Sequence, residues 1–129
     1  MTAGPEPTFY ESIGGHDTIK LIVDTFYDGV EGDDVLRALY PEEDLGPARD
    51  RFRMFLEQYW GGPTTYSEQR GHPRLRMRHA PFEVTPDARD RWLLHFREGL
   101  DRAALSPDHD AQFWAYAQHA ANFMVNSAG

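Results

Sequence analysis

The sequence predicts an all-α domain, and three observations support this. Apolar residues recur at helical spacing along several segments, while no segment alternates with period two for long enough to predict a strand. Glycine pairs and Ser-Pro or Thr-Pro pairs separate these segments, as expected where helices end and begin. A length of 129 residues, 40% of them hydrophobic, suits one compact core. We therefore expect a single domain over residues 1–129, with residues 1–8 forming a flexible polar tail.

The first half of the chain contains three expected elements. A short aromatic segment over residues 9–13 ends at a glycine pair. Apolar residues at helical spacing predict a helix over residues 16–31 with one buried face. Residues 35–40 form a further short helix in this interpretation. Because Pro41 disfavours helical backbone at the residue before it, Tyr40 is expected at a bend.

Three longer helices account for most of the remaining chain. One is expected from residue 46 or 47 to residue 60, with a buried face that runs from Ala48 to Tyr59. Thr85, followed by Pro and Asp, is a strong N-cap signal for the next helix. Ser106, also followed by Pro and Asp, repeats that signal for the last helix.

The segment over residues 62–78 shows neither a helical nor a strand period. Four of the twelve Arg residues of the chain fall within one nine-residue stretch of this segment, although the net charge of the chain is −8. Tyr66 and neighbouring apolar residues resemble anchors and argue against disorder. Two interpretations stay open: a solvated charge run, or a site for an anionic small molecule. His79 closes this segment.

Composition excludes several classes of function. The net charge of −8 opposes sequence-independent binding to nucleic acid, which needs a basic surface. There is no Cys, so thiolate catalysis, thiolate metal sites and disulfides are excluded. No stretch approaches the ~18 apolar residues of a membrane helix. The first eight residues contain no apolar run typical of a secretory signal, so we expect a cytoplasmic protein without a membrane partner.

Polar aromatic residues are the first candidates for a binding site. The chain has eight Phe, six Tyr and three Trp, which either fill a core or line a pocket for a flat ligand. Tyr27, Tyr40 and Trp92 come from three different elements and carry groups that need partners when buried. Each could bond a backbone carbonyl, or the three could converge on one cavity.

The other candidates for chemistry are weaker. No two His residues show the spacing of a helical zinc site, and there is no nucleophile elbow. His95 and His119 lie beside apolar stripes, where partly buried structural roles are expected. His79 is a candidate metal ligand only because it ends the Arg-rich segment and directly precedes Ala-Pro-Phe. The abundant carboxylates are explained by solvated helix faces.

Long motifs in this chain resemble group II of the truncated, or two-over-two, haemoglobins. They are FRMFLEQYWGGP over residues 52–63, YSEQRGHPRLRMRHAPF over residues 66–82, and the aromatic pair at residues 9–10 with its following glycines. The resemblance covers about residues 9–127. It implies a truncated globin-like two-over-two helical sandwich that holds haem b.

The resemblance assigns an iron ligand and a set of residues on the gas-binding side. It implies that His79 is the proximal metal ligand of the haem iron. Tyr27, Tyr40 and Trp92 would face the bound gas and donate hydrogen bonds to it. A neutral imidazole would bind the iron through one ring nitrogen.

The resemblance also assigns residues that contact the haem itself. Arg51, Tyr66 and Arg78 would bind the haem propionates, and Trp92 would line the pocket. Phe52 would be a wall residue, where Leu or Gln is more usual in the family. This departure affects the size of the pocket.

The implied function is binding of oxygen or another diatomic gas at ferrous iron, with a role in oxygen transport or scavenging. The alternative is a redox enzyme with peroxidase-like or nitric oxide dioxygenase activity, for which a reductase would supply electrons. A haem-free helical sensor or interaction module is the third hypothesis, and an absorption spectrum separates it from the others. The sequence permits a homodimer without requiring one.

Overall fold

The computed structural model describes residues 6–71 and 83–127, and within these ranges every regular element is a helix. The all-α prediction is therefore confirmed for the described residues. Each of these helices is too short or too polar to cross a lipid bilayer. In chain order the helices are α1 (Phe9–Ser12), α2 (Gly15–Glu31), α3 (Asp34–Arg37), α4 (Gly46–Tyr59), α5 (Thr65–Arg70), α7 (Pro86–Ala103) and α8 (Pro107–Met124).

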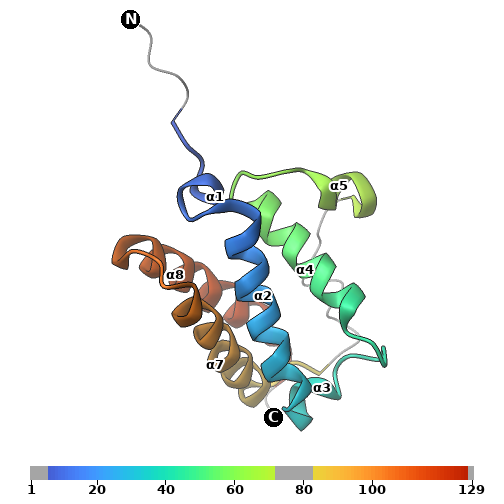
Figure 1. Ribbon diagram of the computed structural model, residues 1–129. Helices are drawn as coiled ribbons and strands as arrows, with labels where there is room; N and C mark the ends of the chain where they lie inside the picture. Colours follow the sequence, from blue (N-terminus) through green and yellow to red (C-terminus); the bar gives the residue numbers. More distant parts are fainter. Residues whose placement is uncertain (1–5, 72–82, 128–129) are drawn as a thin grey trace, which may run out of the picture.

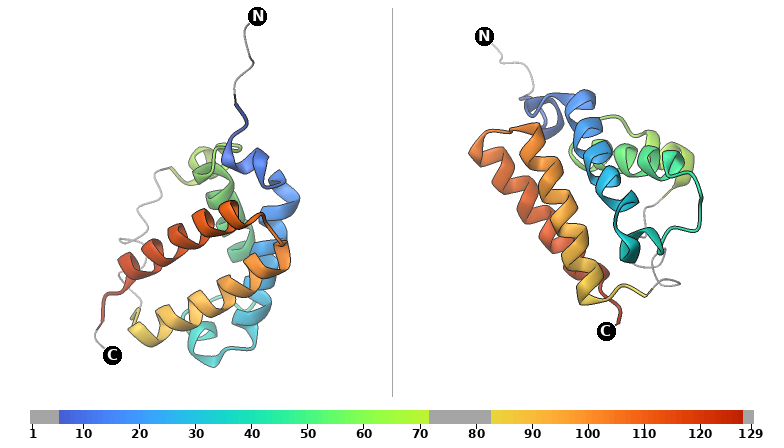
Figure 2. Two further views of the ribbon diagram at one scale, coloured as in Figure 1. Left: turned by 90° about the vertical axis from the view of Figure 1, so that its left-hand side faces the viewer. Right: turned by 60° about the horizontal axis from the view of Figure 1, so that its bottom comes forward.

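Four long helices form two layers. Helix α2 runs through the middle of the molecule, with α4 on one side and the α7/α8 pair on the other (Figure 1). The left view of Figure 2 shows α7 and α8 side by side in front of α2 and α4, and the right view shows the pair beside α2. The short helices α3 and α5 lie at the ends of the α4 layer, so that α3 also contacts α7.

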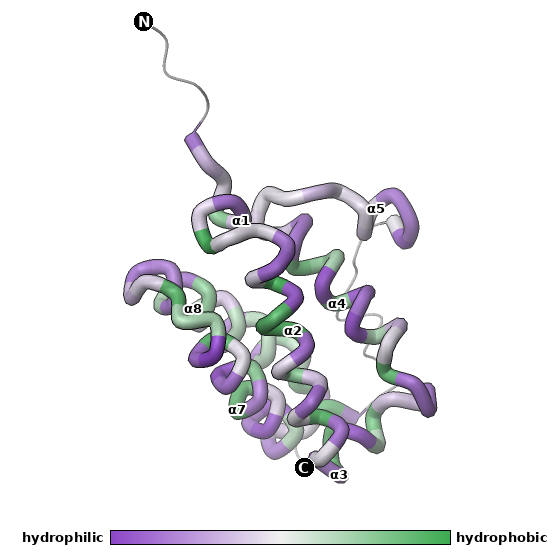
Figure 3. The backbone as a smooth tube through the Cα atoms, viewed as in Figure 1, coloured by the Kyte–Doolittle hydropathy of each residue, from purple (hydrophilic) through white to green (hydrophobic). Residues whose placement is uncertain are grey.

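The core lies where α2 faces α7 and α8. Helix α2 buries a stripe at spacings of three and four residues, as its apolar period predicts. Hydrophobic residues recur along α2, α7 and α8 (Figure 3), and the buried ones belong to one core cluster. Phe26, Phe96 and Phe113 fill the centre and are fully buried. Their rings meet in sequence, with centroids 6.3 Å apart for Phe26 and Phe96 and 5.5 Å apart for Phe96 and Phe113.

Gly99 permits the close approach of α7 to α2. A Cβ atom at this position would lie 2.7 Å from the carbonyl oxygen of Ile22, which is closer than a real Cβ contact allows. The absence of a side chain therefore fixes how near the two helices can pack.

The predicted caps of the two C-terminal helices are confirmed. The Thr85 hydroxyl accepts a hydrogen bond from the N–H of Ala88 at 3.0 Å, and the Ser106 hydroxyl accepts one from the N–H of His109 at 3.4 Å. These bonds satisfy N–H groups that have no partner within the helix. The start signals therefore placed α7 and α8 correctly.

Helix α3 is shorter than predicted, because it ends at Arg37 rather than at Tyr40. The Arg37 guanidinium donates to the carbonyl oxygens of Tyr40, Glu42 and Glu43 at 3.1, 2.7 and 2.8 Å. These bonds turn the following chain back over α3. Tyr40 itself is not helical, in agreement with the effect of Pro41 on the residue before it.

The segment predicted to be irregular contains helix α5. Its six residues are too few for an apolar period, but a long-range contact fixes its start. The side chain of Gln58 in α4 accepts from the N–H of Ser67 at 2.9 Å and donates to its hydroxyl at 2.6 Å. A second correction concerns Tyr59, which was expected on the buried face of α4 and is 53% exposed.

Candidate functional site

A cavity of about 590 Å³ opens between α4, α7 and α8, a volume typical of sites for small molecules and cofactors. Most of its wall is apolar, and residues of the α3–α4 connection form part of that wall. Its lining residues are Tyr27, Leu36, Leu39, Tyr40, Pro41, Glu42, Ala48, Arg51, Phe52, Phe55, Tyr66, Arg70, Val84, Ala88, Arg89, Trp92, Tyr116, Ala120, Ala121 and Met124.

Three polar aromatic residues that the sequence singled out all line this cavity. Tyr27 comes from the buried stripe of α2, Tyr40 from the bend after α3, and Trp92 from the second turn of α7. The hydroxyl oxygens of Tyr27 and Tyr40 lie 3.4 Å apart, within hydrogen-bond distance. The Trp92 ring stacks on Phe96 with centroids 5.0 Å apart and planes 11° from parallel, which fixes its orientation.

Burial keeps both tyrosines in the neutral form. Loss of solvent raises the pKa of Tyr27 well above its ordinary value, and the neighbouring Tyr40 raises it further. Burial also raises the pKa of Tyr40. Both groups therefore keep an O–H that can donate a hydrogen bond, as does the indole N–H of Trp92. Together they can stabilise a small ligand that carries partial negative charge.

Further aromatic side chains line the cavity beside these three residues. Phe52 projects from α4, with ring centroids 5.5 Å from Phe26, 6.0 Å from Trp92 and 6.2 Å from Tyr27. Tyr66 from α5 is buried and meets Phe55 edge-on at 5.5 Å. Flat side chains thus line much of the space, as a flat ligand requires.

Cationic side chains lie on the cavity lining as well. Arg51, Arg70 and Arg89 all contribute to it, from α4, α5 and α7. Arg51 Nη2 donates to Glu42 Oε1 at 2.9 Å, and this bond lowers the pKa of the Glu42 carboxyl despite its burial. The second carboxylate oxygen of Glu42 is buried and has no hydrogen-bond partner among the described residues.

Two of the predicted site residues, Arg78 and His79, lie outside the described residues. The other six are all on the lining of the one cavity, including the expected propionate contacts Arg51 and Tyr66. His95 is buried in a hydrogen bond between its Nε2 and Asp33 Oδ2 at 2.8 Å, so its role is structural. His119, expected to be partly buried, is exposed.

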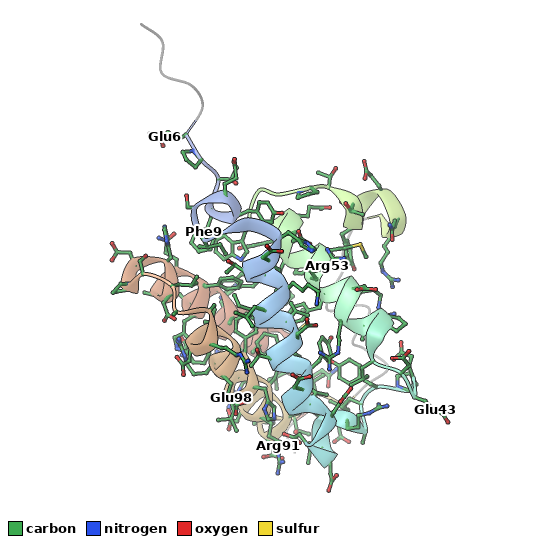
Figure 4. The ribbon with its side chains drawn as sticks, in the orientation of Figure 1. Glu6, Phe9, Glu43, Arg53, Arg91 and Glu98 are labelled. Atoms are coloured by element: carbon green, nitrogen blue, oxygen red, sulfur yellow. The ribbon has the colours of Figure 1, made fainter. Side chains whose placement is uncertain are left out.

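Two carboxylates depart from the expectation that acidic residues occupy solvated faces. Glu57 is buried, where it accepts from the Tyr10 hydroxyl at 3.1 Å and pairs with His16 and Arg53. Arg53 reaches this carboxylate from the face of α4 that turns toward α1 and α2 (Figure 4). Asp33 is buried as well. Arg53 is one helical turn from Glu57, but Tyr10 and His16 lie more than forty positions from it, so the helical period alone could not reveal that it is buried.

The cavity also contains residues that sequence reasoning missed. Glu42 lies in the α3–α4 connection, which has no periodic pattern, and its neighbour Glu43 projects into solvent (Figure 4). Tyr116 was assigned to the buried face of the last helix and not to a site. The signal available in the sequence was a tyrosine on the predicted buried face, because a buried phenol needs a polar partner or a cavity.

Comparison with known proteins identifies the family. The bacterial-like globin family matches residues 8–126. The group 2 truncated hemoglobin YjbI of Bacillus subtilis is 36% identical over 117 residues, which cover 91% of this chain and 87% of that protein. A thermostable hemoglobin structure from Thermobifida fusca is 54% identical with a TM-score of 0.93, covering 95% of this chain and 100% of that one. A truncated oxygen-avid haemoglobin structure from Bacillus subtilis is 35% identical with a TM-score of 0.87, covering 93% and 100%.

Fold and site together define a globin with the two-over-two arrangement of helices. The chain belongs to the bacterial-like globin family and is a group II truncated haemoglobin. Membership of this family implies a haem cofactor and binding of a ligand at its iron.

The described residues fit a haem. The cavity offers aromatic walls to a flat macrocycle, arginine side chains to its acidic groups, and neutral O–H and N–H donors to a small ligand. Arg51 donates one hydrogen bond to Glu42, and its guanidinium carries further N–H donors that could bind an acidic group of the ligand.

Proposed function

We propose that this protein binds oxygen, or a similar diatomic gas, at a haem b whose proximal ligand is His79. The observation that supports this most strongly is the convergence of Tyr27, Tyr40 and Trp92 on one cavity from three separate elements. The name of the similar oxygen-avid haemoglobin from Bacillus subtilis agrees with oxygen as the ligand. When bound, ferrous haem supplies the coordination position at which a diatomic gas acquires partial negative charge.

The three polar aromatic residues act as hydrogen-bond donors to the gas. Tyr27 and Tyr40 share one hydrogen bond at 3.4 Å, so one of their two O–H groups remains available to donate into the cavity. The Trp92 N–H can only donate. Because the surrounding wall is largely apolar, each bond is electrostatically stronger than it would be in water.

The size of the effect follows from the strength of single hydrogen bonds. A neutral donor contributes about 1 kcal/mol, and 1.4 kcal/mol corresponds to a tenfold change in an equilibrium constant. Two donors that act together would slow the release of oxygen about 30-fold relative to a cavity without them. The protein would therefore hold oxygen tightly.

Arg51, Tyr66 and Arg78 are proposed to hold the acidic groups of the haem. A guanidinium has five N–H donors, and Arg51 uses one of them for Glu42, so others remain for a second carboxylate. The Tyr66 hydroxyl comes from a buried residue on α5, next to the same lining. Phe52 would pack flat aromatic surface against the macrocycle together with Trp92.

A spectroscopic titration tests the assignment of His79. Purified protein is titrated with hemin, and its absorption spectrum is compared with those of His79→Ala and of His119→Ala, a matched control on an exposed residue. We expect the wild type and His119→Ala to show an intense Soret band, and His79→Ala to lose tightly bound haem. A native Soret band and full haem content in His79→Ala would move the ligand role to another residue.

The alternative function is redox catalysis. It would use the same hydrogen-bond donors, so a kinetic measurement is needed to distinguish it from reversible gas binding. Rapid turnover with peroxide, or with nitric oxide in the presence of a reductase, would show it. Roles in oxygen transport, a cytoplasmic location and a homodimer likewise remain predictions from the sequence.

A further inference from the structure

Asp33 connects two helices, α3 and α7, through a single buried carboxylate. Its Oδ1 accepts hydrogen bonds from the N–H groups of Val35 and Leu36 at 3.1 and 3.2 Å, which caps α3. The same oxygen accepts from Arg91 Nη1 at 3.2 Å, and Oδ2 accepts from His95 Nε2 at 2.8 Å. Arg91 and His95 both belong to α7, so this carboxylate fastens α3 to α7.

The third element at this cluster is α2. A Cβ atom on Gly29 would lie 2.3 Å from His95 Nδ1, so the imidazole packs directly on the α2 backbone. The carboxylate of Glu98 lies near the same ring nitrogen, with its Oε1 3.8 Å from Nδ1. The His95 ring is thus packed between the α2 backbone and the Asp33 carboxylate.

The Asp33 carboxylate is charged at neutral pH. Burial by itself would raise the pKa of Asp33, but the hydrogen bond from His95, the N–H of Leu36 and the nearby Arg91 together bring that pKa below its usual value. A charged acceptor with several donors forms stronger hydrogen bonds than a neutral one. The connection between α3 and α7 is therefore stiff.

Each of the proposed gas donors lies next to this cluster along the chain. Trp92 stands between Arg91 and His95 on α7. Tyr27 precedes Gly29 on α2 by two residues. Tyr40 follows α3, whose Leu36 lies on the cavity lining, and the turn from Leu36 to Leu39 leads directly to it.

We infer that Asp33, together with His95, is a positioning site for gas binding, because it fixes α3 and α7 so that Tyr40 and Trp92 face the same ligand. This inference rests on the proposed function, in which those residues donate to the gas. Asp33 itself does not line the cavity and acts only through the helices that it joins. Without the Asp33 carboxylate, Tyr40 and Trp92 would still be present, but the distance between them would no longer be fixed.

Asp33→Ser separates positioning from helix capping. Serine is a good N-cap and keeps the bonds to the first turn of α3. Its hydroxyl is too short to reach Arg91 and His95 on α7. Asp34→Ser is the matched control, since Asp34 is the exposed neighbour in the same helix and its change removes the same charge.

Two measurements on the haem-loaded proteins read out the spacing of the donors. The first is the rate of oxygen dissociation by stopped flow, for which we expect an increase of about fivefold in Asp33→Ser and none in Asp34→Ser. The second is the infrared C–O stretch of the carbon monoxide complex, which responds to nearby donors. We expect one dominant band in the wild type and in Asp34→Ser, and a broadened or shifted band in Asp33→Ser.

His95 supplies a second pair of variants if Asp33→Ser does not fold. Glutamine carries an amide N–H that can replace the Nε2 donor, whereas leucine carries none. We expect His95→Gln to retain the wild-type rate and C–O band, and His95→Leu to behave as described for Asp33→Ser. Wild-type rates and bands in both Asp33→Ser and His95→Leu would overturn the inference and leave Asp33 as a helix cap alone.

Failure of this inference is distinguishable from failure of the proposed function. If Tyr40→Phe and Trp92→Phe speed oxygen release while Asp33→Ser and His95→Leu do not, the donors are correct and the positioning role is wrong. If Tyr40→Phe and Trp92→Phe also release oxygen at the wild-type rate, the donor assignment is wrong, and the positioning role is overturned with it.

Discussion

The hydroxyl oxygens of Tyr27 and Tyr40 lie 3.4 Å apart at the end of a largely apolar cavity, although thirteen positions separate the two residues in the chain. Tyr27 is on a long helix and Tyr40 is in an irregular bend, so their meeting depends on the packing of α3 against α2 and α7. The pair is neutral because burial raises both pKa values. One shared bond therefore leaves one O–H group to face a ligand.

This sharing predicts that the two hydroxyls are energetically coupled. Tyr27→Phe and Tyr40→Phe should each speed oxygen dissociation about fivefold, because each removes a hydrogen bond from the network. The double variant should fall short of the product of the single effects, because residues in one network are not additive. Stopped-flow dissociation rates of the wild type, the two single variants and the double variant form a double-mutant cycle that measures this coupling. Effects that multiply fully would mean that the hydroxyls act independently.

Arg51 should contribute to holding the haem. Arg51→Ala removes a guanidinium from the cavity lining, and a partly exposed ion pair is worth up to about 1 kcal/mol, so we expect haem loss to quicken about two- to fivefold. Transfer of hemin to excess apomyoglobin measures this rate. Arg102→Ala is the control, because Arg102 is exposed at the end of α7. Equal transfer rates for all three proteins would show that Arg51 does not hold the propionates.

The charge on Asp33 should stabilise the fold in a pH-dependent way. The pKa of Asp33 is lower in the folded protein than its usual unfolded value of about 3.9. Because the folded state binds the proton less readily, the contribution is fully present above the unfolded pKa and is lost as the pH falls through the folded one. The difference in unfolding free energy between the wild type and Asp33→Ser, measured with urea, should thus be largest near pH 6 and should shrink as the pH falls below about 4. A difference that stays constant over this range would contradict the prediction.

Gly99 should be indispensable for the packing of α7 on α2. Gly99→Ala places a methyl group 2.7 Å from the Ile22 carbonyl oxygen, so the helices must separate, at a cost of about 1–3 kcal/mol. Gly32→Ala is the comparison, because a Cβ there would meet only the Gly29 carbonyl at 3.8 Å. Thermal unfolding should show a clearly lower Tm for Gly99→Ala alone. Equal Tm values would mean that α7 accommodates the methyl group without moving.

Much of the fold was predictable because it depends on local signals. The helix caps at Thr85 and Ser106 depend only on residues that are adjacent in the sequence. The buried residues of α2 likewise recur every three or four positions. Tyr40 was placed at a bend by the proline that follows it. Helix α5 was missed because its stability depends on the contact of Gln58 with Ser67, nine residues away.

The site was predictable in its members but not in its arrangement. Tyr27 and Trp92 could be chosen because each lies on a buried stripe and carries a polar group. That they would share a wall with Tyr40 depends on contacts between α2, α3 and α7, which no single-helix period contains. The buried carboxylate of Asp33 illustrates the same limit, because its partners on α7 are about sixty positions away.

The rate at which oxygen leaves the ferrous, haem-loaded protein is the decisive quantity, measured by stopped flow in the wild type and in the triple variant Tyr27→Phe, Tyr40→Phe and Trp92→Phe. The triple variant keeps the aromatic walls and removes every proposed donor to the gas. Release should become about 30-fold faster, as two cooperating donors of about 1 kcal/mol each require. Dissociation rates within a factor of about two of each other would contradict the proposed role of these three residues, since such a factor is below the contribution of a single hydrogen bond.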